Sequence, residues 1–216
     1  WANGINEQVF DFLRKSLKDD TPIPADIHQR LRQLLLEYVV VGGMPEAVKT
    51  FFATHDMNQV CQVQRHILNG YRDDMIKYAR AEDKPRIREC FDSIPRQLSR
   101  DNKKFTYSQV RKGGRSKEYI SCLQWIEDAG IVRRCYNLML PELPLSGNSI
   151  QDCFKVYMAD TGLLVSMLDD GTQGDILQGN LWTYKGAVYE NLVADILGKM
   201  GRKLYYYQKE SGLEID

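Results

Sequence analysis

The first part of the chain has the hydrophobic spacing of α-helices. Apolar residues recur at every third or fourth position from Val9 to Leu17 and from Ile27 to Tyr38, which places them on one face of each helix. Gly42-Gly43 predicts the end of the second helix, and Pro45 suits the first turn of a third. Asp56 predicts the N-terminal cap of a long fourth helix.

The pattern changes after a fifth amphipathic helix, which is expected around residues 87–98. The segments expected next are a short strand at 105–107, a short helix from Ser108 to Gly113, a helix capped by Ser116 that stops at Gly130, and strands at 131–140 and 154–159. This order of elements is typical of a winged helix. Another small α+β domain would show the same order.

A further unit is expected at the end of the chain. The pattern predicts a helix at Lys185–Met200, a strand at Leu204–Tyr207, a turn at Glu210–Gly212 and the start of a strand at Leu213–Asp216. The predicted fold class is therefore mainly α with minor β (α+β). The predicted units are a helical region at 1–83, a winged-helix domain at 84–168 and an α/β unit at 169–216.

Composition narrows the class of protein. The 29 basic and 29 acidic residues among 216 cancel, so any attraction to nucleic acid must come from a local cluster. The five cysteines form no CxxC pair and fit neither a disulfide framework nor a zinc site, which favours free thiols in a reducing compartment. No apolar run approaches the roughly 18 residues of a membrane span, so we expect a cytoplasmic protein without a membrane partner.

One local cluster is strongly basic. Eight basic residues lie between Arg96 and Lys117, and only Asp101 opposes them. The candidate nucleic-acid-binding residues are Arg100, Lys103, Lys104, Arg111, Lys112, Arg115 and Lys117, which on a winged helix would neutralise backbone phosphates. The helix that would enter a groove carries Glu118, Glu127 and Asp128, which argues against tight base readout. A basic face that docks on an acidic surface of the same protein is the alternative.

Two motifs bear on catalysis. The chain has no GxxxxGK[ST] phosphate-binding loop, so we expect no ATP hydrolysis from this segment alone. Glu190 and Asp216 would share a divalent metal through oxygen ligands if the helix and the last strand face each other. Spacing alone favours ordinary exposed carboxylates.

Six phrases occur together in one order along the chain: YVVVGGMPEAV at 38–48, FTYSQV at 105–110, LQWIEDAGIV at 123–132, KVYMADTGLL at 155–164, KGAVYENLV at 185–193 and LEID at 213–216. This series resembles the C-terminal uncharacterised domain of the prokaryotic AAA-type ATPase family. The resemblance implies an upstream ATPase domain that uses ATP and Mg, then a winged helix, then a unit similar to PD-(D/E)XK nucleases. Glu190 matches the helix acid of that unit, and Asp216 matches the acid at the end of its second strand.

The sequence departs from that family pattern where the chain stops. The next strand, with its E-x-K lysine, is absent, so we expect a truncated restriction-endonuclease-like unit, two cut ends and no nuclease activity or cofactor in this fragment. The function expected is that of a C-terminal ATPase fragment that contacts DNA through a basic winged helix and pairs with its own ATPase domain. The alternative is a regulatory module that docks on the ATPase core or on a partner protein.

Overall fold

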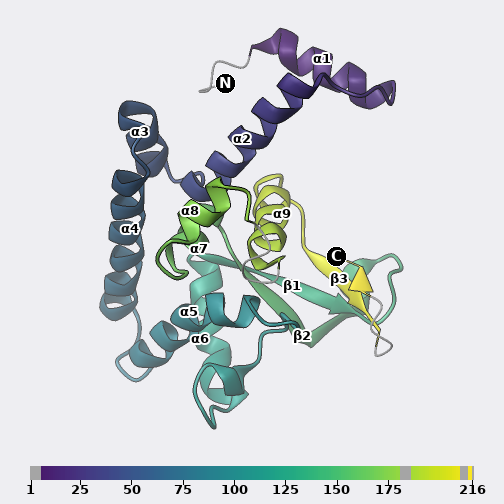
Figure 1. Ribbon diagram of the computed structural model, residues 1–216. Coiled ribbons are helices and arrows are strands. Elements are labelled where there is room, and N and C mark those ends of the chain that lie inside the picture. Colours follow the sequence, from purple (N-terminus) through teal and green to yellow (C-terminus); the bar gives the residue numbers. More distant parts are fainter. Residues whose placement is uncertain (1–5, 181–185, 210–213, 216) are drawn as a thin grey trace.

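The computed structural model describes residues 6–180, 186–209 and 214–215. In these residues the chain is mostly helical, with one small mixed sheet of four strands in the order β2-β1-β3-β4 (Figure 1). This confirms the predicted class, mainly α with minor β. None of the helices in the described ranges is long and apolar enough to cross a membrane.

The N-terminal region, as described from residue 6 on, contains the helices α1 (Glu7–Lys18), α2 (Ala25–Val41), α3 (Pro45–Thr54) and α4 (Met57–Tyr78). Gly42, at φ +70°, follows the last residue of α2, and Pro45 is the first residue of α3. The Asp56 carboxylate accepts the backbone N–H of Asn58 and so caps α4. These three boundaries confirm the sequence prediction. α1 and α2 extend away from the sheet, and α3 packs along α4 (Figure 1).

The central region follows the predicted order, with differences in detail. Its elements are α5 (Lys84–Leu98), the 3₁₀ turn η1 (Tyr107–Gln109), α6 (Ser116–Asp128), β1 (Val132–Leu138), the 3₁₀ turn η2 (Leu145–Asn148) and β2 (Ser149–Met158).

The strand expected at 105–107 is wrong. Phe105 instead makes one backbone hydrogen bond, from its N–H to the Phe154 carbonyl oxygen at 2.8 Å, and the chain then turns into η1. The helix expected from Ser108 is only that 3₁₀ turn. Arg115 occupies the cap position of α6, one residue before Ser116. β2 begins at Ser149, earlier than expected, because its first residues pair with the end of β1.

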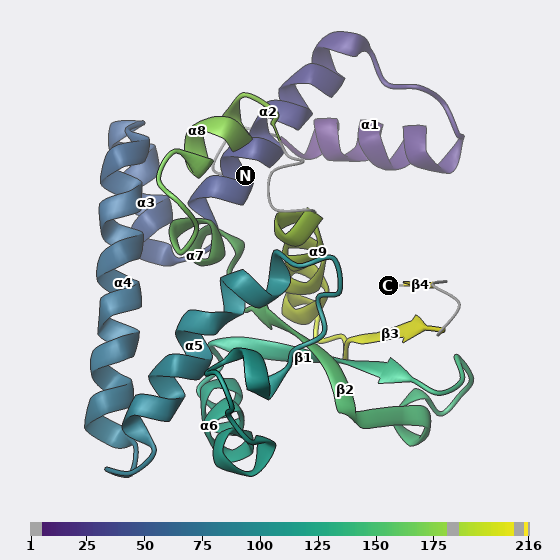
Figure 2. The same cartoon turned by 60° about the horizontal axis from the view of Figure 1, so that its bottom comes forward.

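The remaining elements are α7 (Thr161–Ser166), α8 (Thr172–Leu177), α9 (Ala187–Lys199), β3 (Tyr205–Gln208) and β4 (Glu214–Ile215). The sequence predicted α9 and β3 but neither α7 nor α8. β3 runs parallel to β1, with Tyr136 opposite Tyr205, so the late strand joins the sheet of the β1–β2 hairpin (Figure 2). The expected turn at Glu210–Gly212 lies outside the described residues.

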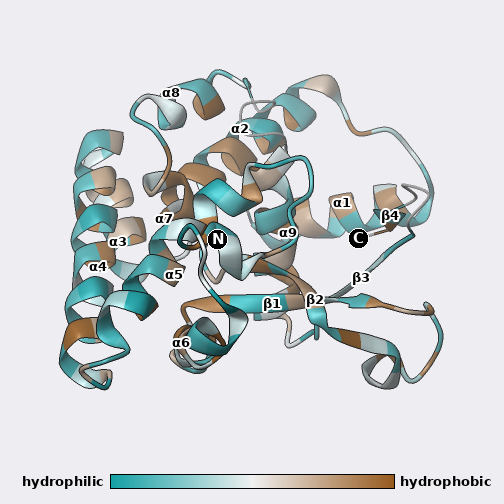
Figure 3. Cartoon of the chain, turned by 90° about the horizontal axis from the view of Figure 1, so that it is seen from below, coloured by the Kyte–Doolittle hydropathy of each residue, from teal (hydrophilic) through white to brown (hydrophobic). Residues whose placement is uncertain are grey.

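The sheet is covered on both faces. Successive side chains of a strand point to opposite faces of the sheet, so Arg134 and Cys135 point to opposite faces. Lys155 is the register partner of Cys135 and therefore points to the same face as Cys135. Arg134 contacts Glu127 of α6, whereas Lys155 contacts Glu190 of α9. α6 and α9 therefore lie on opposite faces of the sheet. The largest buried cluster contains residues of α5 and α6, of the strands and of α9. The apolar residues of α7 are also buried in the interior of the protein (Figure 3).

Candidate functional site

The predicted acid Glu190 lies at the start of α9 in a cluster of opposite charges. Its Oε1 is 2.6 Å from the ammonium nitrogen of Lys103, and its Oε2 is 3.2 Å from that of Lys155. The hydroxyl of Tyr157 also donates to Oε2, at 2.9 Å. On β4, the carboxylate of Glu214 approaches the Lys155 nitrogen to 2.5 Å. The structure therefore joins two residues that were predicted for different sites, Lys103 and Glu190.

Electrostatics keep Glu190 ionised. Burial raises the pKa of its carboxyl, but the hydrogen bond from Lys103 and the charge of Lys155 outweigh burial and hold this pKa below its usual range. Lys155 is buried in the sheet and also lies 4.8 Å above the ring of Tyr206. The sequence carried a signal for this residue, since a lysine interrupts the apolar run of β2, but its partners are distant in the chain.

The divalent metal predicted at Glu190 and Asp216 stays a prediction for the full-length protein. Both Glu190 oxygens already accept from ammonium or hydroxyl groups, and Asp216, the second predicted ligand, lies outside the described residues. In the described ranges, no group of three or more His, Cys, Asp or Glu residues is placed to hold a metal ion. We therefore derive no metal-dependent step from this cluster.

The other candidate residues follow the surface from the end of α5 to the start of α6. Lys103 is largely buried against Glu190, and Arg111 lies 3.8 Å from Glu89 of α5. In the part of the chain that the structure describes, no ion pair is formed by the five others, Arg100, Lys104, Lys112, Arg115 and Lys117. Four of these five are exposed, and Lys104 is half-buried. The free positive charge thus lies on the loops around α6.

The start of α6 combines attraction and repulsion for an anion. Its backbone N–H groups carry the positive end of the helix dipole, and Lys112, Arg115 and Lys117 lie beside it. Glu118 lies in the first turn, however, and its carboxylate accepts the backbone N–H of Arg115 at 3.3 Å. An incoming phosphate therefore meets the flanking side chains rather than a vacant helix end.

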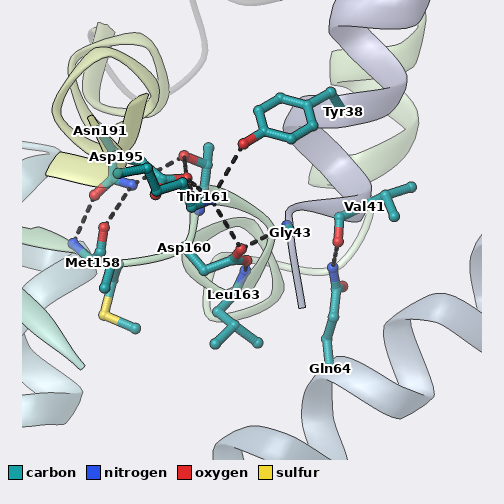
Figure 4. A network of polar contacts seen from close by, with 12 residues as sticks. Tyr38, Val41, Gly43, Gln64, Met158, Asp160, Thr161, Leu163, Asn191 and Asp195 are labelled. Atoms are coloured by element: carbon teal, nitrogen blue, oxygen red, sulfur yellow. Dashed lines mark hydrogen bonds and ion pairs between the residues drawn. The ribbon is translucent and has the colours of Figure 1, made fainter. Parts of the chain in front are cut away.

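A second polar group, which the sequence did not predict, joins α2, α7 and α9 (Figure 4). The Asp160 carboxylate accepts the backbone N–H of Gly43 at 2.7 Å and that of Leu163 at 3.0 Å. Burial raises the pKa of Asp160 despite these two hydrogen bonds. Asn191 of α9 accepts the backbone N–H of Met158 at 2.8 Å.

The neighbouring acid of this group is fully buried on α9. One carboxylate oxygen of Asp195 accepts a hydrogen bond from the Lys199 ammonium group at 2.9 Å. The same oxygen accepts a longer one from the backbone N–H of Thr161 at 3.4 Å. Its second oxygen has no hydrogen bond in the described residues, although the Arg133 guanidinium lies 3.9 Å from it. These groups neutralise one another within the fold, so the network is a structural junction.

α9 also presents apolar side chains to solvent. Tyr189, Val193, Ile196, Leu197 and Met200 are each at least 38% exposed. Part of this face borders a small apolar cavity of about 250 Å³ between α9 and the strands, next to Cys135 and Leu204. A contiguous apolar helix face of this kind is a feature of protein contact sites.

Comparison with known proteins gives one match. A family model described as a domain of unknown function, DUF8612, matches residues 32–174. No curated protein and no solved structure matches the chain. The matched segment runs from α2 to α8 and contains the whole basic segment and the β1–β2 hairpin.

Proposed function

Since this chain belongs to the DUF8612 family, a family defined without a function, we propose its function from its own geometry: it binds the phosphate backbone of nucleic acid. The contact surface is formed by Arg100, Lys104, Lys112, Arg115 and Lys117, which form no ion pair with any residue that the structure describes. Their free positive charge is the observation that carries the proposal. Binding to this surface would release counterions from the nucleic acid.

The order of elements supports the same function. α5, α6 and the β1–β2 hairpin follow one another as in the winged helix expected from the sequence, but a single backbone hydrogen bond at Phe105 replaces its first strand and the 3₁₀ turn η1 replaces its second helix. The acids of α6 lie where they oppose base readout. Glu118 is at its first turn, and Glu127 is held by Arg134. We therefore propose backbone contact without sequence preference, with DNA as the partner.

Two wider proposals rest on the resemblance to AAA-type ATPases. We propose that the full-length protein is a cytoplasmic ATPase that uses ATP and Mg, with this region C-terminal to its ATPase core. We propose that the region itself is not catalytic. The absence of a GxxxxGK[ST] motif from its sequence and the engagement of Glu190 by lysines support this.

Fluorescence anisotropy tests the surface. A labelled DNA duplex is titrated with the chain at several salt concentrations, and we expect an affinity that falls steeply with salt. Replacing Arg100, Lys104, Lys112, Arg115 and Lys117 by Glu should abolish binding at moderate salt. The slope of log K against log salt should become shallower by about 0.9 for each phosphate that is no longer neutralised. Lys103 is left intact because its replacement would disturb Glu190.

The control for this variant reverses exposed cations elsewhere. Lys15, Lys18, Arg30 and Lys49 lie on α1, α2 and α3 and form no ion pair in the described ranges. Their replacement by Glu should leave duplex affinity nearly unchanged apart from a small long-range effect. Equal decreases in affinity for both variants, or no duplex binding by the unaltered chain at low salt, would refute the basic surface as a nucleic-acid site.

A second candidate function is supported by the exposed apolar face of α9. We propose as the alternative that this face docks on the ATPase core, which would make the region a regulatory module. Calorimetric titration of the separately expressed core with the chain tests it. Replacing Val193 and Met200 by Asp should abolish the heat of binding, and the Glu variants of the basic surface should not.

A further inference from the structure

A groove of about 380 Å³ lies on the face of the sheet that α6 covers, lined by residues of β1, of η2 and the start of β2, and of the segment that leads into β3. β3 pairs with β1 only at Tyr136 and Asn137, so the first residues of β1 have no strand partner on the side away from β2 in the described ranges. In place of a strand, Glu127 of α6 accepts the backbone N–H of Arg134 at 3.0 Å. The groove reaches this edge, the end of α6 and the segment that leads into β3.

The lining of the groove is positively charged. The basic residues Arg134, Arg202 and Lys203 and one acid, Glu127, line it, whereas the side chain of the neighbouring Arg133 points to Asp195 on the other face of the sheet. Glu127 is engaged by Arg134, to which it is bound through Nε at 2.6 Å. Arg202 and Lys203 are exposed and form no ion pair with any residue that the structure describes. The groove therefore has uncompensated charge for an anion.

Neutral groups complete the site. Gln151 and Ser149 of β2 also line the groove, where the Gln151 amide donates to the Ser149 hydroxyl at 2.9 Å. Both side chains offer hydrogen-bonding groups to a ligand. Tyr136 and Tyr205 are register partners on β1 and β3 and both line the groove, on one face of the sheet. The guanidinium carbon of Arg134 lies 5.7 Å from the centre of the Tyr136 ring.

Cations beside adjacent tyrosines are the combination that single-stranded nucleic acids require. The phosphates need positive charge, and unpaired bases stack on aromatic rings regardless of sequence. A free phosphate ion would use the cations but not the rings, and the paired bases of a duplex are not available for stacking.

We infer that this groove binds a nucleotide unit of single-stranded nucleic acid, with the phosphate at Arg202 and Lys203 and the base on Tyr205. The inference rests on the proposed function in that both take nucleic acid as the ligand. The two surfaces differ, however, since the groove lies at the end of α6 that is remote from Lys112, Arg115 and Lys117.

The test uses the full chain and two labelled probes of equal length, an oligothymidine strand and a mixed-sequence duplex. Arg202→Glu with Lys203→Glu should weaken single-strand binding about tenfold or more and lower its salt slope by about 0.7 for each phosphate that is no longer neutralised. Tyr205→Val keeps a residue suited to a strand and should weaken single-strand binding about tenfold without changing the salt slope. Duplex binding should change little in the Tyr205 variant.

Lys15→Glu with Lys18→Glu on α1 is the charge-matched control, and urea unfolding verifies that each variant is folded. Single-strand affinity that survives all groove variants would overturn the inference and leave the basic surface standing. The inference would also be overturned by the following pair of results. Tyr205→Val leaves single-strand affinity unchanged, and the Arg202 and Lys203 variant lowers the affinity for both probes equally. Single-strand binding that depends on the groove, with no duplex binding, would sustain the inference and remove the proposed duplex contact.

Discussion

At the scale of single residues, the environment of Glu190 decides what this carboxylate does. Two ammonium groups and a phenol hydroxyl surround its oxygens, so it acts as a fixed negative charge between β2 and the loop after α5. A buried lysine such as Lys155 needs the counter-charges that Glu190 and Glu214 supply, because an ammonium group without a counter-charge is costly inside a protein. We therefore expect removal of the Glu190 charge to destabilise the fold.

The pH dependence of stability tests this role. Because the pKa of Glu190 is lower in the folded chain than its ordinary value, protons bind preferentially to the unfolded chain as the pH falls. The stability that Glu190 contributes is complete above the ordinary value of 4.5 and is lost as the pH falls through the lowered one. Urea unfolding of Glu190→Gln and of the unaltered chain should show a gap at neutral pH that shrinks in acid.

Exposed Glu142→Gln controls for the removal of one carboxylate. A gap between Glu190→Gln and the unaltered chain that stays constant from neutral to acid pH would show that the ion pairs with Lys103 and Lys155 do not stabilise the fold.

At the scale of elements, Gly42 after α2 and Gly162 in α7 allow these two helices to pack closely. A Cβ atom on Gly162 would lie 2.7 Å from the backbone nitrogen of Gly42, and one on Gly42 would lie 2.3 Å from Asp160 Oδ1. Gln64 of α4 closes the junction by donating to the carbonyl oxygens of Val40 and Val41. The backbones approach so closely that no side chain fits between them.

Alanine at Gly162 should therefore be destabilising. The new Cβ meets backbone atoms that cannot move independently, and we expect a decrease of about 1–3 kcal/mol or more in the free energy of unfolding. Gly174 in α8 is the matched control, because a Cβ there meets nothing within 4 Å and its φ is not positive. Gly174→Ala should stabilise the chain by about 0.5–1 kcal/mol. Denaturant titration measures both, and equal effects would refute the close approach.

The elements show which features local sequence determines. Gly42, Pro45 and Asp56 act on their own helix ends, so their roles were predictable from neighbouring residues. α7 and α8 have six residues each, too few for a helical period to emerge, and their formation depends on packing against α2.

Only the part of the candidate site that is local in sequence could be predicted. Charge along the chain located the basic segment, but the pairing of Lys103 with Glu190 depends on tertiary structure, and so do Lys155 and the groove at Arg202.

At the scale of the whole molecule, β3 connects regions that sequence patterns predicted as separate units. β1 and β2 form one sheet with β3 and β4, and Tyr206 is buried in the same core as α5 and α6. The Tyr206 hydroxyl lies 3.4 Å from the Cys153 sulfur on β2, and burial raises the pKa of this tyrosine above its ordinary value. Removal of β3 should therefore lower the stability of the whole sheet.

Tyr206→Ala tests this coupling. Removing a buried aromatic ring should cost about 3–5 kcal/mol. With Trp1 and Trp182 replaced by Phe, the fluorescence of Trp125 reports on α6 alone. We expect its urea midpoint to fall together with the midpoint measured by circular dichroism. A midpoint of Trp125 that does not move would show that α6 and β1 fold independently of β3.

The parallel pairing of β1 with β3 also sets an order of events during protein synthesis. β1 and β2 leave the ribosome and form their hairpin first, while the partner for the other edge of β1 has not been made. Until α9 and then β3 have been translated, that edge presents unsatisfied backbone groups to other nascent chains. Glu127, which comes just before β1 in translation, shields part of the edge early through Arg134. Slow translation across α7 to α9 would lengthen this exposed interval and favour aggregation.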